Sequence, residues 1–187
     1  NIALVLHIDA GADFVRTTAV AFFLLYLILM VVWLVNAHER RRALGEAQAA
    51  MDDACAWVNE RQQFGKGIKT FQLVQEHIVE MQIELTNTRN FLYRTCWKMD
   101  NGIPVNNDAA MLKRYGAPAL TDCCSRALQL MGGLGFTDET RVSRLMLDCR
   151  GFQIGGGTVE IMVHISGRGI LKEYAKAAED PDYLWTI

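Results

Sequence analysis

The segment Asn59–Gln72 has the sequence NERQQFGKGIKTFQ and separates two stretches in which apolar residues recur at helical spacing. Gly65 and Gly67 permit positive φ and therefore a sharp reversal of the chain. Thr70 is an acceptable N-cap for the following helix, whose first apolar residue is Phe71. The segment predicts two antiparallel helices joined by a basic, aromatic turn.

Helical periodicity continues on both sides of this turn. The helix before it carries one apolar stripe, formed by Leu44, Ala47, Met51, Ala54, Cys55 and Val58. Further helices are expected over about 71–99, 108–131 (kinked at Pro118), 139–147 and 158–177, with glycine breaks at 132–135 and 155–157. Since the chain has only 3 prolines in 187 residues, we expect an all-α, antiparallel four-helix-bundle-like domain over residues 37–178 and a tail over 179–187.

Composition narrows the function classes. A net charge of -2, with no basic tract outside residues 40–42, argues against nucleic acid as a partner. The 5 cysteines form no C-x-x-C pair and are interpreted as small buried hydrophobes in a reducing compartment. No metal site is predicted.

The run Ala19–Val35 contains no charge, glycine or proline. Its length of about 25 Å as a helix is just enough to cross a hydrocarbon core, so we expect a membrane span over residues 19–36 after an extension over 1–18. A buried core helix stays open as an alternative, and a signal peptide would need its positive charges before the run. The arginines at 40–42 predict a membrane-anchored chain, with membrane lipid as a partner. The expected location is the mitochondrial inner membrane with the helical domain in the matrix, or a bacterial inner membrane with that domain on the cytoplasmic side.

Four motifs follow one another in a recognisable order. They are Arg61-x-x-Phe-Gly-Lys with Gln72, then Gln129-Leu-Met-Gly-Gly-Leu-Gly135, Asp148-Cys-Arg150, and Ile154-Gly-Gly-Gly-Thr-Val-Glu-Ile161. Together they resemble the C-terminal helical domain of the acyl-CoA dehydrogenases over about residues 44–174. Neither the family's N-terminal helical domain nor its central β-domain is found in the sequence.

The resemblance implies an FAD site at a subunit interface. Arg61 matches a pyrophosphate-binding arginine, and Phe64 matches an aromatic residue near the adenine. The other matching positions are Gln72, Gln129, Gly132 and Gly133 on the dinucleotide side, and Thr158 and Glu160 at the start of the last helix. Purely structural roles stay open for Arg61 as a helix-end charge, Phe64 as a hydrophobic staple and Thr158 as an N-cap.

The family's catalytic base has no clear counterpart. In most members a glutamate abstracts the substrate's α-proton, and its position here is Gly156. A minority carry the base on the first helix of the domain, where the ungapped alignment places Val35. Glu39 lies one helical turn, about 6 Å, beyond that position and is only a weak candidate.

Two function classes therefore remain. The first is a membrane-anchored, non-catalytic subunit that uses the family's assembly surface within a larger membrane complex, respiratory or otherwise energy-converting. The alternative is the C-terminal half of a split FAD-dependent acyl-CoA dehydrogenase that another chain completes. In both cases we expect association with itself or with a homologous acyl-CoA dehydrogenase-like chain.

Overall fold

The computed structural model describes residues 42–179. The predicted extension over residues 1–18 and the predicted membrane span over residues 19–36 lie outside these residues. Within the described part, no helix combines the length and apolar character needed to cross a membrane. The structure therefore tests the predicted helical domain, from residue 42 onward.

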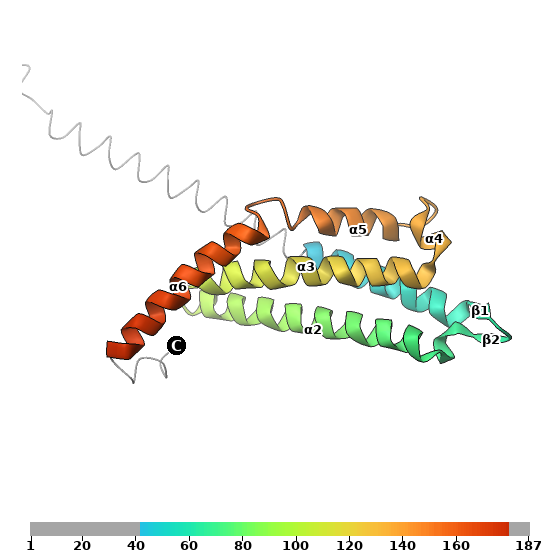
Figure 1. Cartoon of the computed structure of the whole chain (residues 1–187), viewed down its shortest axis with the longest axis horizontal. Helices are drawn as coiled ribbons and strands as arrows, with labels where there is room; N and C mark the ends of the chain where they lie inside the picture. Colours follow the sequence, from blue (N-terminus) through green and yellow to red (C-terminus); the bar gives the residue numbers. More distant parts are fainter. Residues whose placement is uncertain (1–41, 180–187) are drawn as a thin grey trace, which may run out of the picture. The chain divides into compact units, whose positions relative to one another are not determined.

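The described part is built from helices, most of which run side by side, whereas the last one crosses them at an angle (Figure 1). A first helix, described over residues 42–60, is followed by α2 (Gln72–Asp100), α3 (Asn106–Met131), the single turn α4 (Gly133–Phe136), α5 (Val142–Gly151) and α6 (Val159–Glu179). Helix α3 is central, because α2, α5 and α6 all pack against it. The predicted all-α domain is confirmed.

The predicted bounds of α2, α3 and α6 agree with the structure to within about two residues, the usual uncertainty of helix ends. Helix α5 was expected from residue 139 but begins at Val142. The hydroxyls of Thr137 and Thr140 donate to the Leu134 carbonyl at 3.0 and 3.4 Å, which holds these residues in turns before the helix starts. Helix α3 runs through Pro118 without interruption.

The core depends on small side chains in the first helix. Ala43, Ala47, Ala50 and Ala54 are all buried and recur at helical spacing, so they form a stripe on which α3 and α5 can approach closely. The Cys123 thiol of α3 lies 3.8 Å from the Ala47 carbonyl. The predicted stripe is confirmed at its centre, whereas Leu44 and Cys55 are only partly buried at its edges.

The connection between the first helix and α2 is more structured than predicted. It forms a hairpin of two short strands, β1 (Gln62–Gln63) and β2 (Lys66–Gly67), and then a 3-10 turn over Ile68–Thr70. The tip residues Phe64 and Gly65 have φ of 54° and 76°, as the two central residues of a type I′ turn require.

Two details of the predicted turn are wrong. Gly67 has φ of -64°, so positive φ falls on Phe64 instead of the second glycine. Thr70 is not the N-cap of α2, because Phe71 occupies that position and the Thr70 hydroxyl donates to the Gly67 carbonyl at 2.8 Å. Thr70 therefore stabilises the 3-10 turn.

Candidate functional site

A cleft of about 370 Å³ lies where the first helix, the hairpin and the junction between α3 and α4 meet. Its lining residues are Trp57, Arg61, Gln63, Ile68, Leu130, Met131, Gly132, Gly133 and Leu134. The structure thus brings together Arg61, Gly132 and Gly133, which the sequence places in two distant motifs.

Arg61 follows the last turn of the first helix, and its backbone N–H donates to the Trp57 carbonyl at 2.9 Å. Its guanidinium carbon lies 5.5 Å from the centroid of the Trp57 ring, within the range of a cation–π contact. Among residues 42–179, Arg61 forms no ion pair with a carboxylate. Its charge is therefore available to an anion in the cleft.

The glycines of the α3–α4 junction differ in their surroundings. Gly132 has φ of 60° and ψ of -137°, a conformation that favours glycine. A Cβ added to Gly132 or to Gly133 would meet nothing within 4 Å, whereas one on Gly135 would lie 2.8 Å from the Leu128 carbonyl oxygen. Gly135 is required by packing, and the first two glycines expose backbone to open space.

Phe64, Gln72 and Gln129 are exposed and do not belong to the cleft lining. Phe64, at the hairpin tip, is 91% exposed and contacts the Phe71 ring edge-on at 6.2 Å between centroids. That exposure excludes its role as a buried staple within this chain. Gln72 is the first residue of α2, and Gln129 is in the last turn of α3.

The remaining predicted positions lie at the start of α6, away from the hairpin (Figure 1). Lys113 of α3 donates to the Gly155 carbonyl just before this start. Lys113 and Gln129 are separated by about 16 residues of α3, or roughly 24 Å of helix axis. The structure therefore divides the predicted site into two groups instead of gathering it in one place.

Glu160 occupies the N-terminus of α6. The pKa of its carboxyl is lowered, first by a hydrogen bond from its own backbone N–H and then by one from the Thr158 hydroxyl. The Thr158 hydroxyl also accepts a hydrogen bond from the Ile161 backbone N–H at 3.4 Å. Thr158 and Glu160 thus accept hydrogen bonds from some of the backbone N–H groups that this helix terminus leaves unpaired.

Gly156 is exposed and has φ of 61°. It has no side chain that could accept a proton. The other two positions considered for the base, Val35 and Glu39, lie outside the described residues.

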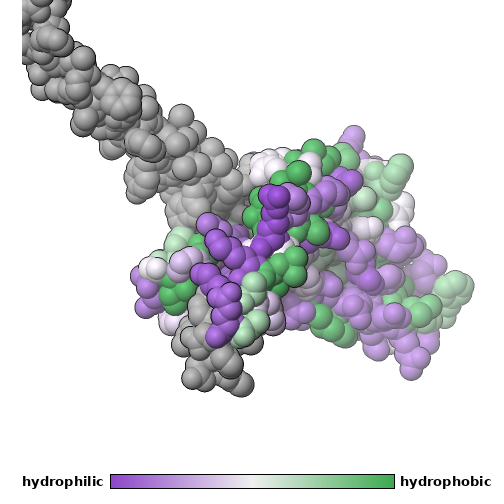
Figure 2. All heavy atoms as spheres, turned by 60° about the vertical axis from the view of Figure 1, so that its left-hand side comes forward, coloured by the Kyte–Doolittle hydropathy of each residue, from purple (hydrophilic) through white to green (hydrophobic). Residues whose placement is uncertain are grey.

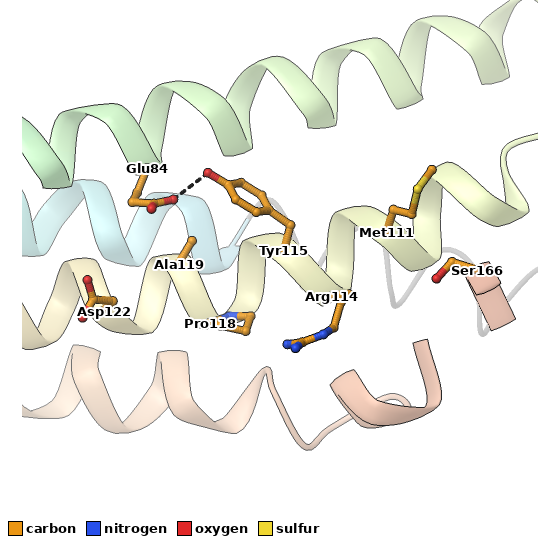
Figure 3. A pocket seen from close by; sticks show the side chains of 8 residues that line it. All are labelled: Glu84, Met111, Arg114, Tyr115, Pro118, Ala119, Asp122 and Ser166. Atoms are coloured by element: carbon orange, nitrogen blue, oxygen red, sulfur yellow. Dashed lines mark hydrogen bonds between the residues drawn. The ribbon is translucent and has the colours of Figure 1, made fainter. Parts of the chain in front are cut away.

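A larger pocket, of about 540 Å³, lies between α2, α3 and α6 and contains none of the predicted site residues (Figure 3). There Tyr115 of α3 points toward Glu84 of α2 and donates to its carboxylate at 2.6 Å. Burial, and after it this bond, raises the pKa of the Tyr115 hydroxyl. The pair links α2 to α3, and we assign the pocket no ligand.

Sequence reasoning missed Trp57 and Gln63 as lining residues of the cleft. Trp57 precedes Arg61 by four residues, a spacing that places two side chains on the same face of a helix. That spacing was a usable signal. Nothing in the sequence marked Gln63, because its position depends on the unpredicted strand β1.

Comparison with known proteins agrees with this architecture. Residues 39–171 match the family model described as acyl-CoA dehydrogenase, C-terminal domain. The probable acyl-CoA dehydrogenase YdiO of Escherichia coli is 43% identical over 141 residues, which are 75% of this chain and 36% of that protein. The chain thus spans about a third of the length of this relative.

Solved structures give the same result. An acyl-CoA dehydrogenase from Slackia heliotrinireducens is 38% identical with a TM-score of 0.76, over 81% of this chain and 40% of that one. A structure of PigA with FAD and proline is 29% identical with a TM-score of 0.71, over 74% of this chain and 36% of that one.

These relatives correct the predicted location. An inner-membrane position, mitochondrial or bacterial, was expected from residues 19–42, but the similar proteins are named as acyl-CoA dehydrogenases and come from bacteria. The inner-membrane prediction is therefore wrong, and the associated lipid and respiratory-complex partners have no support.

The match over residues 39–171 covers most of the chain and carries the motifs around Arg61, Gly132 and Thr158 in their family order. The chain belongs to the acyl-CoA dehydrogenase family, of which it contains the C-terminal helical domain.

Proposed function

We propose that this domain holds the ADP end of FAD within an acyl-CoA dehydrogenase whose other domains come from outside residues 42–179. The observation that carries the proposal is the cleft in which Arg61 meets Gly132 and Gly133. A planar guanidinium suits the oxygens of a pyrophosphate, and glycine backbone can approach a dinucleotide closely. PigA, a relative of similar fold, has been solved with FAD.

The residues present fit this half of the cofactor. Arg61 forms no ion pair within the described part, so an anion need not displace a carboxylate. The space beside Gly132 and Gly133 is open, and no packing contact among the described residues explains a glycine at 133. When bound, FAD supplies the hydride acceptor of the family's reaction.

We further infer that a complete site takes its two ends from different chains. The hairpin of β1 and β2, which Arg61 directly precedes, and the start of α6 lie at separate ends of the helical domain (Figure 1). The family resemblance implies FAD at a subunit interface. Large apolar side chains are also left exposed on two of the longer helices, α2 and α6. They are Leu73, Val79, Ile83, Tyr93 and Trp97 on α2, and Ile161, Val163, Ile165, Leu171 and Tyr174 on α6.

Figure 2 brings the α6 end forward and shows hydrophobic residues beside hydrophilic ones on that face. Exposed apolar surface of this kind favours association. A second copy of this chain, or a homologous acyl-CoA dehydrogenase-like chain, is the partner that the resemblance implies.

Catalysis requires a base that the described residues do not provide at Gly156. We expect the chain alone to reduce no artificial electron acceptor when it is supplied with FAD and a panel of acyl-CoAs. Turnover that appears only after a second chain is added supports the split enzyme. A non-catalytic assembly subunit is the second candidate. The missing carboxylate at Gly156 favours it, and it predicts no turnover even after a second chain is added. Turnover by the chain alone that Glu39→Gln abolishes would contradict both.

Calorimetric titration of the full chain with ADP tests the cofactor half directly. Replacement Arg61→Ala should weaken ADP binding by about 1.5–3 kcal/mol, the typical contribution of a hydrogen bond to a charged group. Arg168→Ala, which removes an exposed arginine of α6 outside the cleft, is the matched control and should leave binding unchanged. Absence of ADP binding by the unaltered chain would overturn the proposal.

A further inference from the structure

Trp57 occupies two environments at once. It is partly buried against the hydrophobic core of the domain, and it also lines the cleft beside Arg61. Its position four residues before Arg61 puts both side chains on one face of the first helix. The hydrophobic core therefore holds the indole ring on one side, and another part of the ring faces the cleft.

Arg61 itself is exposed and lies at the point where the first helix ends. A long arginine side chain in such a place loses rotamer freedom when it binds a ligand, and this loss weakens binding. The Trp57 ring, 5.5 Å from the guanidinium carbon, restricts that freedom before any ligand arrives. An aromatic face also leaves the N–H donors at the guanidinium edge free for phosphate oxygens.

We propose that Trp57 is a positioning residue, which holds the Arg61 guanidinium toward the cleft for a pyrophosphate. The inference rests on the proposed ADP site and adds to it the residue that prepares the arginine. Contacts of this kind at exposed sites correspond to a change in affinity of about two- to five-fold.

The test is ADP titration of the full chain carrying Trp57→Leu or Trp57→Phe, after thermal unfolding has confirmed that each variant is folded. Trp57→Leu keeps an apolar side chain but removes the aromatic face, and should weaken ADP binding about two- to five-fold. Trp57→Phe keeps an aromatic face and should recover most of the affinity. The matched control is Phe71→Leu, which also removes an aromatic ring next to a cation. The Phe71 ring centroid lies 4.5 Å from the Lys66 Nζ, but Phe71 does not line the cleft.

A double-mutant cycle separates positioning from general packing. If Trp57 acts through Arg61, Trp57→Leu should have no further effect on ADP binding in a chain that already carries Arg61→Ala. Equal effects in both backgrounds would overturn the positioning role while leaving the ADP site intact. Failure of the unaltered chain to bind ADP would instead overturn the proposed function, and this inference with it.

A second readout needs no ligand. In the unliganded chain, the indole ring current should shift the NMR signals of the Arg61 side-chain protons upfield, and Trp57→Leu should remove that shift. Arg61 signals at their random-coil positions in the unaltered chain would overturn the proposal even if ADP binds.

Discussion

The two ends of the predicted site use similar residue types in opposite ways. At the hairpin end, Arg61 forms no ion pair within the described part, and Gly132 and Gly133 border open space. At the α6 end, Lys113 binds the Gly155 carbonyl, and a Cβ on Gly157 would lie 2.9 Å from the Met162 side chain. At the hairpin end, the polar groups are free to bind a ligand or a partner chain. At the α6 end, hydrogen bonds within the chain already satisfy them.

This difference teaches how far a shared motif determines a role. Both ends carry a family glycine motif, yet among residues 42–179 Gly132 and Gly133 border open space, whereas a Cβ on Gly157 would meet the Met162 side chain. At the α6 end, the motif residues Thr158 and Glu160 bond to each other and to the helix terminus. We therefore expect substitutions at the α6 end to change stability, and those at the hairpin end to change binding.

Lys113→Met gives the largest expected effect on stability. Lys113 is buried, and its ammonium donates to the Gly155 carbonyl, so the substitution removes a charged hydrogen bond from the interior. We expect the free energy of unfolding to fall by about 1.5–3 kcal/mol, measured by urea denaturation.

Its effect on ADP binding should be small, because Lys113 lies roughly 24 Å of helix axis from Gln129. Lys172→Met is the control, since it removes an exposed lysine of α6. Loss of ADP affinity with unchanged stability would contradict the division between the two ends.

The sequence predicted the helices well because their apolar residues recur at helical spacing over long stretches. Residues 72–100 form one helix as expected, and the turn after it uses Gly102 at φ of 71°. The hairpin was missed because Phe64 adopts positive φ, which its residue type disfavours. The backbone preferences of single residue types do not reveal such a conformation, because it depends on the pairing of β1 with β2 around the two-residue turn.

The site was predictable only in part. Arg61 and Gly132 were identified from motifs, but their meeting in one cleft depends on how the first helix packs against α3. Trp57 was missed because motif comparison gives weight to residues at matching positions and none to those that support them. The separation of Thr158 from Arg61 also required the fold, since sequence order contains no distances.

Gly135→Ala and Gly133→Ala form a matched pair within one motif. A Cβ on Gly135 would lie 2.8 Å from the Leu128 carbonyl oxygen and 2.9 Å from the Met131 Cβ. We expect overpacking to lower the free energy of unfolding by about 1–3 kcal/mol for Gly135→Ala. Gly133→Ala should leave stability unchanged or slightly raised, because residue 133 is helical and its surroundings are open.

ADP titration should rank the two glycine variants in the opposite order, because Gly133→Ala should lose more affinity for ADP than Gly135→Ala. Gly133→Ala adds a methyl group at the open face of the cleft and should weaken binding, whereas folded Gly135→Ala should bind normally. Destabilisation by Gly133→Ala equal to that of Gly135→Ala would show that the first glycine also serves packing.

Gly156→Glu restores a carboxylate at the family's usual base position but should create no activity. Gly156 has φ of 61°, where a residue other than glycine loses roughly 1–2 kcal/mol. Thermal unfolding should show this loss, and Gly156→Asn should show less, because asparagine tolerates left-handed backbone better. Reduction of an artificial acceptor by the Gly156→Glu chain alone, with FAD and acyl-CoA, would refute the requirement for further domains.

The smallest expected effect is a pH dependence at the start of α6. The pKa of Glu160 is lowered below its ordinary value of 4.5 by hydrogen bonds from its own N–H and from Thr158. A carboxyl whose pKa is lower in the folded state stabilises the fold above its unfolded pKa and loses that contribution as the pH falls. The unaltered chain should therefore be slightly more stable than Glu160→Gln at pH 6, and the two should converge toward pH 3. Urea denaturation across this range measures the difference, with Glu60→Gln, at the far end of the first helix, as the control.

A difference between the chain and Glu160→Gln that persists unchanged to pH 3 would show that the carboxylate does not stabilise this helix terminus. The contrast between the two ends of the domain would then rest on Lys113 and the glycines alone.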